Sequence, residues 1–215
     1  MPKPSPAPIP FARSVLRNHR HVCAFFSSAK EEYDTLLPFI CDGLNCGQRA
    51  YHVLPSKYRE EHLQQLRDAG IDVEAAQRSR QLELAFPEHT YLRSGRFDKE
   101  AMLALTQEAL RAGTSLGFPL TRLIAHAETA VDDQPSEWIE YEMRLNEVLT
   151  PYDDPVICTY DTNLLNATLV LDILRTHPVA IIGGVLVENS FFSSPEAFLR
   201  EIRERTSSRP QAYRG

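Results

Sequence analysis

The chain has 215 residues, of which 43% are hydrophobic and 24% are charged. This composition is ordinary for one folded domain and argues against a chain that is disordered throughout. The formal net charge of −6 gives little long-range attraction for nucleic acid or an anionic membrane surface, so neither is expected as a direct partner.

The two ends of the sequence look different from its middle. The N-terminal segment MPKPSPAPIPFA lacks the continuous apolar core of a signal peptide, and its alternating prolines predict an extended, disordered tail over residues 1–18. A second disordered tail is expected over 206–215, leaving a single domain over 19–205. No apolar run is long enough to predict a transmembrane helix. No C-x-x-C pair is present, which indicates reduced thiols in a cytoplasmic protein; the four cysteines are Cys23, Cys41, Cys46 and Cys158.

The first half of the chain begins with an apolar run, HVCAFF at residues 21–26, that is typical of a buried strand. Ser28 and Glu31 then form an S-x-x-E capping box, and apolar residues follow at helical spacing until about Gly47. The next expected elements are a strand at 50–54, a helix from Ser56 to Gly70, a short helix capped by Asp72, a strand at 82–86 and a helix from Asp98 to Gly113.

The second half continues the alternation of strands and helices. The pattern predicts a strand at 121–127, a helix from Ser136 to Leu149, a strand at 156–160, an apolar helix over 164–175, one or two strands within 179–187, and a last helix opened by Ser194 and Pro195. This order predicts an α/β fold, a three-layer sandwich with a mainly parallel central sheet and helices on both faces. Of the predicted strands, the one at 82–86 is the least expected to lie at the centre of the sheet.

The first strand–turn–helix does not contain a phosphate-binding loop. Its turn, FFSSAKEEYDT, has no glycine, so the backbone cannot easily form a cradle of N–H groups. Glu31 and Glu32 follow Lys30 and would repel a phosphate. The sequences G-x-x-x-x-G-K-[ST], G-x-G-x-x-G, G-x-S-x-G and H-E-x-x-H are also absent. We therefore expect neither ATP hydrolysis nor tight ATP binding, and no catalytic residue, cofactor or metal.

The helix from Ser136 has polar side chains on a partly apolar stripe. Glu142 and the adjoining Asn146 lie on that stripe, where a carboxylate and an amide are costly unless they are paired. We expect both to be at least partly buried and hydrogen-bonded. They either bind a ligand or fasten a loop, and the sequence favours neither reading.

Strand ends supply further candidate ligand-binding residues, because ligands in parallel sheets bind beyond the carboxyl ends of the strands. Cys158, Tyr160 and Asp161 end one strand, and Glu128 follows another. The alternative is that Cys158 belongs to the core and Asp161 caps the next helix. His177 precedes the final strand and is expected at the opposite sheet end, either as a ligand contact or as a helix cap.

These candidates together predict a modest pocket for a small organic molecule, lined by at least three of Glu128, Glu142, Asn146, Cys158 and Tyr160. A further pattern, His19, His21 and Cys23, places three metal-ligand types on one strand face. Because no second ligand cluster matches it in the sequence, a polar strand start is the favoured interpretation of that pattern.

Several stretches occur in an order that resembles one family, the MEDS domains, whose name stands for methanogen/methylotroph DcmR sensory domain. They are HVCAFF at 21–26, YLRSGRFD at 91–98, YEMRLN at 141–146, ICTYD at 157–161 and RTHP at 175–178. The resemblance covers about residues 19–192. It implies a sensory domain for small molecules, such as hydrocarbon derivatives, that occurs with histidine kinases, transcription regulators and anti-sigma-type regulators. It also implies a distant similarity to the RecA/KaiC-like ATPase core.

The leading hypothesis is therefore a stand-alone intracellular sensory module that is not an enzyme. It would bind a small organic ligand and pass the signal to a separate protein, such as a histidine kinase or a transcription or anti-sigma regulator. One alternative is a degenerate RecA-like protein that binds nucleotide, or an enzyme whose chemistry is not recognised. The other is a pure protein-interaction regulator of a kinase or sigma-factor circuit. The sequence does not indicate the oligomeric state.

Overall fold

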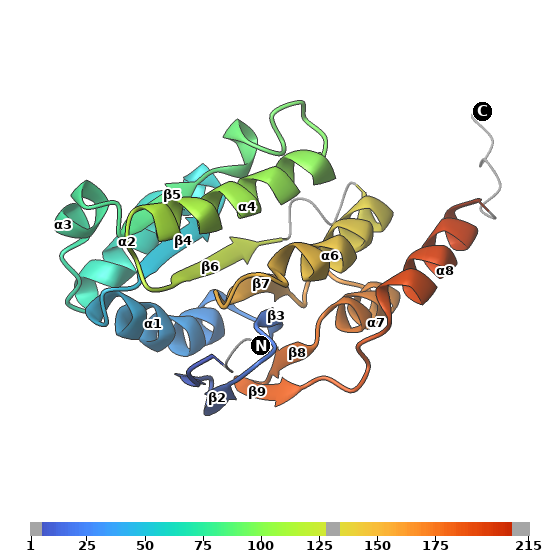
Figure 1. The fold of residues 1–215 in the computed structure, drawn as a ribbon, viewed down its shortest axis with the longest axis horizontal. Coiled ribbons are helices and arrows are strands. Elements are labelled where there is room, and N and C mark those ends of the chain that lie inside the picture. Colours follow the sequence, from blue (N-terminus) through green and yellow to red (C-terminus); the bar gives the residue numbers. More distant parts are fainter. Residues whose placement is uncertain (1–5, 128–133, 208–215) are drawn as a thin grey trace.

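A computed structural model of the protein describes residues 6–127 and 134–207. Its centre is a seven-stranded sheet with the strand order β5-β4-β6-β7-β3-β8-β9 (Figure 1). All neighbours are parallel except β8 and β9. The strands are β3 (His21–Phe26), β4 (Arg49–Val53), β5 (Leu82–Ala85), β6 (Thr121–His126), β7 (Val156–Asp161), β8 (Val179–Ile182) and β9 (Val185–Glu188). The predicted mainly parallel sheet is confirmed, and the strand at 82–86 lies at its edge.

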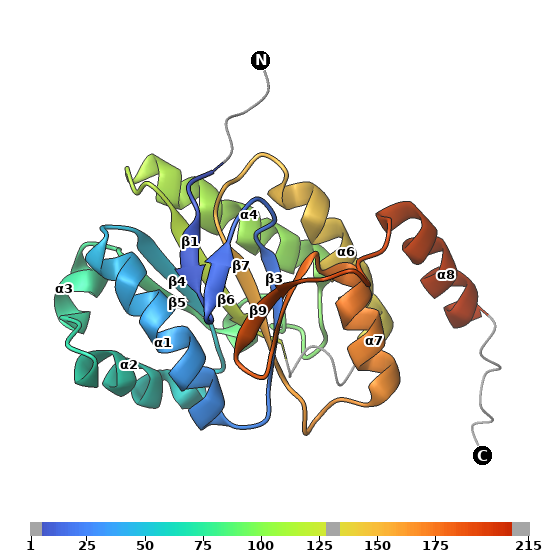
Figure 2. The same cartoon turned by 90° about the horizontal axis from the view of Figure 1, so that it is seen from below.

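Helices cover both faces of the sheet, as Figures 1 and 2 show. One face carries α1 (Ala29–Asn45), α2 (Arg59–Asp68) and α3 (Val73–Arg78), and the other carries α4 (Lys99–Ser115), α6 (Pro135–Leu149), α7 (Ala167–Thr176) and α8 (Pro195–Ser207). Single 3-10 turns occur at Ser56–Tyr58 and Pro87–His89. The expected three-layer sandwich is therefore present.

The core has two parts, one on each face of the sheet, because successive side chains of each strand point to opposite faces. In β3, Val22, Ala24 and Phe26 pack with α1, whereas Cys23 and Phe25 pack with the helices of the opposite layer. Successive side chains of a strand point to opposite faces, so a central strand must be apolar on both. This explains why HVCAFF is buried at every position. The face with Cys23 is the one that positions the polar cluster described below.

Side-chain caps set the beginning of three helices at the predicted residues. Ser28, Asp72 and Asp98 each accept a hydrogen bond from the backbone N–H three residues later. Three helices begin elsewhere. α2 starts at Arg59, because the predicted first residues Ser56–Tyr58 form a 3-10 turn. α6 starts at Pro135 instead of Ser136, with proline in the first turn, where its missing N–H costs no hydrogen bond. α7 starts three residues after the predicted Leu164, because Asn166 caps it by accepting from the N–H of Leu169.

The prediction of a disordered tail over residues 1–18 is wrong for residues 9–16. They form an antiparallel hairpin of β1 (Ile9–Phe11) and β2 (Ser14–Leu16). Ile9, Phe11 and Leu16 are buried, and the Phe11 ring stacks on Phe39 of α1 with ring centroids 4.1 Å apart. The apolar residues between the prolines therefore bury enough surface to order this segment. At the other end, α8 continues to Ser207, and the rest of the predicted tail over 206–215 lies outside the described residues.

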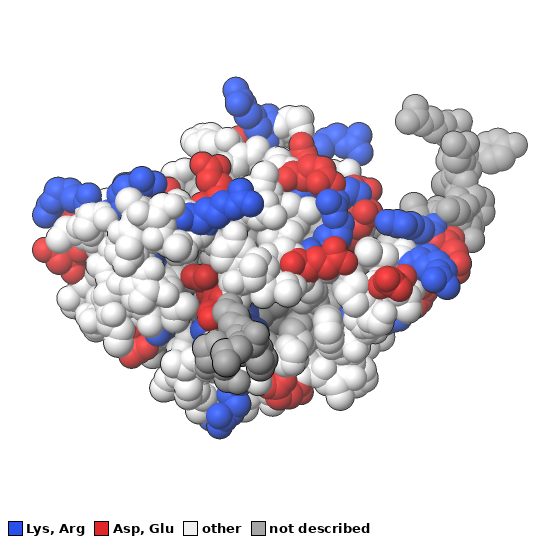
Figure 3. Space-filling view, in the orientation of Figure 1, with Lys and Arg blue, Asp and Glu red and all other residues white. Residues whose placement is uncertain are grey.

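Charges of both signs are mixed on the face of the molecule shown in Figure 3. Many of them form ion pairs between neighbouring helices, such as Lys99 of α4 with Glu137 and Glu140 of α6, and Arg205 of α8 with Asp172 of α7. Exposed pairs of this kind contribute little stability each, and they leave no continuous basic band on that face. Among the described residues, no helix is both long and apolar enough to cross a membrane.

Candidate functional site

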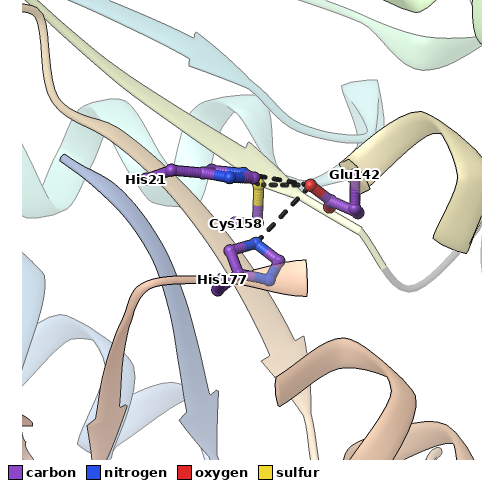
Figure 4. A group of neighbouring side chains, drawn as sticks. All are labelled: His21, Glu142, Cys158 and His177. Carbon is purple, nitrogen blue, oxygen red and sulfur yellow. Dashed lines mark hydrogen bonds and ion pairs between the residues drawn. The ribbon is translucent and has the colours of Figure 1, made fainter. Parts of the chain in front are cut away.

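Glu142 lies at the centre of a group of polar side chains between the sheet and α6 (Figure 4). His21, Cys158 and His177 surround it, and ligand-type atoms of these four residues all lie within 4.8 Å of one another. We call these four residues the buried cluster, since each of them is buried. Polar groups in a core are costly unless they contact one another, so the contacts within the cluster determine its chemistry.

The register of the sheet brings the cluster together. β3 pairs His21 with Val156 of β7 and Cys23 with Cys158, so His21 and Cys158 lie diagonally on the same face. α6 packs on that face and presents Glu142 to it. His177 is the first of the two residues between α7 and β8, and β8 is the other neighbour of β3. Segments that are far apart in the sequence therefore meet beneath α6.

Both carboxylate oxygens of Glu142 have close neighbours. Oε2 lies 3.1 Å from Nε2 of His21, 3.5 Å from Nε2 of His177 and 3.6 Å from Sγ of Cys158. Oε1 accepts a hydrogen bond of 2.6 Å from the Tyr160 hydroxyl. That hydroxyl in turn accepts a hydrogen bond of 3.0 Å from the Trp138 indole N–H. The carboxylate is thus held in one position although it is fully shielded from solvent.

Burial and the Glu142 charge act together on the cluster. Burial by itself would raise the pKa of Glu142, but nearby His177, the close contact with His21 and the hydrogen bond from Tyr160 outweigh it and leave the pKa below its usual value. Burial lowers the pKa of His177 to about 3, so this imidazole is neutral at physiological pH. Burial and the neighbouring carboxylate raise the pKa of Cys158 and Tyr160 well above their usual values, which keeps both protonated in the absence of a bound cation.

Asn146 supports the cluster from one turn further along α6. Its side-chain N–H groups donate to the carbonyls of Glu142, Met143 and Thr176, and its Oδ1 lies 3.1 Å from Nδ1 of His21. Asn146 is half-buried, whereas Glu142 is fully buried. The prediction that both side chains are buried and hydrogen-bonded is confirmed.

A cleft of about 350 Å³ lies at the carboxyl edge of the sheet. It is bounded by residues that follow β3, β4, β6 and β7 and by the first turns of α1, and we call it the carboxyl-edge cleft. This is the position expected for a ligand in a parallel sheet. Its lining includes the apolar or aromatic residues Phe26, Tyr33, Leu54, Tyr58 and Leu164, and the acidic residues Glu32, Glu61 and Asp161.

Glu32 is the most perturbed acid of the cleft. Burial, opposed by the neighbouring Thr159 hydroxyl and assisted by the charge of Asp161, raises the pKa of its carboxyl to about 7. His126 at the end of β6 also faces it, with Nδ1 3.5 Å from Glu32 Oε1. A carboxyl with this pKa gains or loses its proton near neutral pH. The charge of the cleft wall therefore depends on pH and on the charge of any bound molecule.

The N-terminus of α1, which opens onto this cleft, is occupied by a side chain of its own helix. The backbone N–H and the hydroxyl of Ser27 donate to Glu31 Oε2 at 2.9 and 2.8 Å, and the Ser28 hydroxyl accepts from the N–H of Glu31. A helix N-terminus at this place in an α/β fold can bind phosphate through the same kind of donors. Here an internal carboxylate takes that place and repels an anion.

The chain has similarity to known proteins. A family profile, described as MEDS, the MEthanogen/methylotroph, DcmR Sensory domain, matches residues 20–178. The chain belongs to the MEDS family. The transcriptional repressor DcmR of Methylorubrum extorquens (strain DSM 6343 / CIP 106787 / DM4) is 28% identical to this MEDS protein over 163 residues, which make up 74% of this chain and 58% of the repressor. The chain thus spans little more than half of that relative. Family and relative together indicate a sensory, regulatory role.

A solved structure supports the fold assignment. The KaiC-like protein PH0186 from Pyrococcus horikoshii OT3 superposes on the MEDS domain with a TM-score of 0.51 and 13% sequence identity, over 75% of this chain and 69% of that one. The predicted RecA/KaiC-like fold is therefore confirmed. At this level of identity the similarity concerns the fold alone.

The structure distributes the predicted site residues of the MEDS domain over two places. Glu142, Cys158 and His177 belong to the buried cluster and Asn146 supports it, whereas Tyr160 and Asp161 are among the residues that line the carboxyl-edge cleft. Tyr160 also donates to Glu142. Of the described residues expected to line a shared pocket, which are Glu142, Asn146, Cys158 and Tyr160, only Tyr160 lines this cleft. Glu128 lies outside the described residues.

The two histidines of the cluster were only partly anticipated from the sequence. His177 precedes β8, at the sheet end opposite the carboxyl edge, as expected, but it lies 3.5 Å from Glu142, which contacts His21 at the start of β3 instead of reaching the cleft. His21 was read as part of a polar strand start. It is buried, whereas His19 is exposed and Cys23 donates to the Val179 carbonyl. The sequence signal for His21 was its position two residues before Cys23, which places both side chains on the same face of the strand. This spacing does not show that His21 joins the cluster while Cys23 does not.

Cleft residues from α1 were also missed. Glu32 and Tyr33 were read only as part of a helix that repels phosphate, although both line the cleft. The Tyr33 hydroxyl contacts Nδ1 of His62 at 3.2 Å, and Nε2 of His62 contacts Nδ1 of His52 at 2.8 Å. Burial lowers the pKa of His62 to about 4 and that of His52 well below its usual value, so this chain of contacts is uncharged at neutral pH.

Proposed function

We propose that this MEDS domain is a non-catalytic sensor that binds a small organic molecule in the carboxyl-edge cleft and passes the signal to a separate regulatory protein. The observation that carries the proposal is the chemistry of the cleft. Its apolar and aromatic wall is combined with three acids against the two basic residues Lys57 and His126, and its volume of about 350 Å³ is in the range of small-molecule sites. Such a wall suits an uncharged or cationic organic molecule.

The cleft is poorly suited to a nucleotide. A phosphate group would need free N–H donors at the start of α1, but the Ser27 N–H donates to the Glu31 carboxylate and the Glu31 N–H donates to the Ser28 hydroxyl. Asp161, Glu32 and Glu61 add negative charge around the same opening. These contacts support binding of a molecule without phosphate groups and give no support to phosphoryl transfer.

The signal would leave through the segment that joins β7 to α7. Asp161 and Leu164 of this segment line the cleft, and Asp161 holds the segment by accepting from the backbone N–H of Asn163 at 2.8 Å. A ligand that contacts the segment would bias the position of α7, whose outer face exposes Leu171. The receiving protein would be a transcription regulator, a histidine kinase or an anti-sigma-type regulator. The repressor name of the DcmR relative favours the first of these.

The proposal can be tested by blocking the cleft without disturbing the core. Ala29 lines the cleft and is exposed, so Ala29→Trp fills the opening with a large ring. Lys30→Trp is a matched control, since the neighbouring Lys30 is exposed and is not among the lining residues. Native mass spectrometry of the purified protein would reveal a co-purified molecule. Ligand-observed NMR would then screen small uncharged and cationic compounds beside ATP and GTP.

We expect one or more small organic compounds to bind the wild-type protein and Lys30→Trp but not Ala29→Trp. Binding of nucleotides with loss in Ala29→Trp would instead support the degenerate nucleotide-binding alternative. If no compound binds and a partner protein binds equally to all three forms, the sensor proposal fails and a pure interaction role is supported.

A further inference from the structure

The four ligand-type atoms of the buried cluster all lie within 4.8 Å of one another, and the four separations that involve Glu142 Oε2 or join Cys158 to His21 are close to those of a metal-centred tetrahedron. Zinc binds imidazole nitrogen and carboxylate oxygen at about 2.0–2.1 Å and thiolate sulfur at about 2.3 Å, so tetrahedral geometry separates two N or O ligands by about 3.3 Å and a sulfur from either by about 3.6 Å. The observed N–O separations from Glu142 Oε2 are 3.1 Å to His21 and 3.5 Å to His177. The sulfur of Cys158 lies 3.6 Å from Glu142 Oε2 and 3.8 Å from His21 Nε2.

The two imidazoles are oriented as metal ligands are. Asn146 directs its N–H groups to three carbonyls, so its Oδ1 faces Nδ1 of His21 and accepts a hydrogen bond from it. Nδ1 of His177 lies 3.0 Å from the Ile173 carbonyl, which can only accept. In both rings Nδ1 therefore carries a hydrogen, and in the neutral form of each ring Nε2 presents a lone pair to the cluster. Histidines that bind metals are commonly fixed by such an acceptor at their other nitrogen.

This orientation leaves a gap in the hydrogen bonding that a cation would fill. Nε2 of His21 and of His177 both face Glu142 Oε2, and all three atoms are acceptors in the neutral tautomers. Nε2 of His177 is buried, and among the described residues no hydrogen-bond partner reaches it. Lone pairs converging on a carboxylate repel one another unless a positive charge lies between them. The Cys158 thiol has a single proton, and its sulfur lies 3.6 Å from Glu142 Oε2, to which it can donate, and 3.8 Å from Nε2 of His21, so it cannot satisfy all three acceptors.

We infer that His21, Glu142, Cys158 and His177 bind one divalent transition-metal ion, Zn²⁺ by the chemistry of the ligands. Two imidazoles, one thiolate and one carboxylate are typical of Zn²⁺, whereas Mg²⁺ and Ca²⁺ require oxygen ligands. Binding removes the proton of Cys158, which passes to solvent, and leaves one thiolate and one carboxylate to balance the two charges of the ion. The centre as a whole is then neutral, so its burial costs little.

The site lies apart from the carboxyl-edge cleft and goes beyond the proposed sensory function. The protein supplies all four positions of the tetrahedron, so no position is open for substrate, and the ion is structural. It joins β3, α6, β7 and the turn between α7 and β8. The Tyr160 hydroxyl on Glu142 and Asn146 on His21 hold the ligands in place from outside.

Metal analysis of the full chain tests the inference directly. Protein that is purified from zinc-supplemented medium and dialysed without chelator should retain about one zinc ion per chain. Refolding with Co²⁺ should give the strong visible bands of tetrahedral cobalt and a thiolate-to-cobalt charge-transfer band in the near ultraviolet. This measurement uses the wild-type protein and does not depend on the folding of any variant. Removal of the ion with a strong chelator should lower the midpoint of thermal unfolding.

Matched cysteine variants assign the sulfur ligand. Cys158→Ser should abolish the charge-transfer band, and Cys23→Ser, which changes a buried thiol that contacts the Val179 carbonyl instead, should leave it intact. His177→Gln should lose zinc, while His62→Gln, a change of a buried histidine on the opposite side of the sheet, should keep it. Substoichiometric zinc together with a Co²⁺ spectrum like that of the free ion would overturn the inference, as would a charge-transfer band that persists in Cys158→Ser.

Discussion

Glu32 offers a test of the electrostatics of the carboxyl-edge cleft that does not require the ligand. Its carboxyl has a pKa of about 7 in the folded protein, against an ordinary value of 4.5, because burial penalises its charge. An acid whose pKa is raised by folding binds its proton more tightly in the folded state. It therefore destabilises the folded protein increasingly as the pH rises from 4.5 to about 7, and by a constant amount above that.

The size of the effect follows from the difference in pKa. Each pH unit between the two values corresponds to about 1.4 kcal/mol, so ionised Glu32 lowers the free energy of unfolding by about 3 kcal/mol at alkaline pH. Only 15% of its side chain is exposed, so screening by solvent is limited. Glu32→Gln removes the charge and keeps the shape. We expect the variant to match the wild type near pH 4.5 and to exceed it by about 2–3 kcal/mol at about pH 8.

The assay is urea denaturation across this pH range, followed by the fluorescence of the buried and single Trp138. Glu31→Gln is the matched control. Hydrogen bonds from the Ser27 backbone and hydroxyl lower the pKa of Glu31, so its charge stabilises the folded state at neutral pH and that contribution disappears on acidification. The two neighbouring variants should thus deviate from the wild type in opposite directions at about pH 8. A stability difference for Glu32→Gln that is independent of pH would refute the reasoning.

Three further predictions follow from individual contacts. Tyr160→Phe should lower the free energy of unfolding by about 3 kcal/mol, because Glu142 and the Trp138 N–H each lose a hydrogen bond. Its control, Tyr58→Phe at an exposed position, should change the free energy of unfolding by less than about 0.5 kcal/mol in the same urea denaturation assay. Gly113→Ala should destabilise by about 1–3 kcal/mol, because its Cβ would lie 2.0 Å from Thr121 Oγ1, and adding Thr121→Ala should restore most of the loss. Isothermal titration with Mg-ATP should show no micromolar binding, and such binding at the turn of Ser27 would contradict the arrangement of α1 described above.

Much of the fold could be predicted from the sequence, because its signals are local. The apolar runs at β3, β4, β6, β7 and β8 and the side-chain caps at Ser28, Asp72 and Asp98 each act over a few residues and were placed correctly. Alternation of strands and helices then leads to a parallel sheet, since each connection has to cross over. The hairpin at residues 9–16 was missed because its apolar residues stand between prolines and are ordered by packing on Phe39, which is distant in sequence.

The candidate site depended on tertiary structure to a greater degree. Sequence reasoning selected Glu142, Asn146, Cys158 and Tyr160, since polar groups on apolar faces require partners, and it anticipated a cleft at the carboxyl edge of the sheet. Their grouping could not be deduced. It depends on the register of β3 against β7, on the position of α6 over that pair, and on how far the turn at His177 reaches beside β3. A shift of one residue in that register would turn either His21 or Cys158 to the opposite face, so only the folded chain determines that these side chains meet at Glu142.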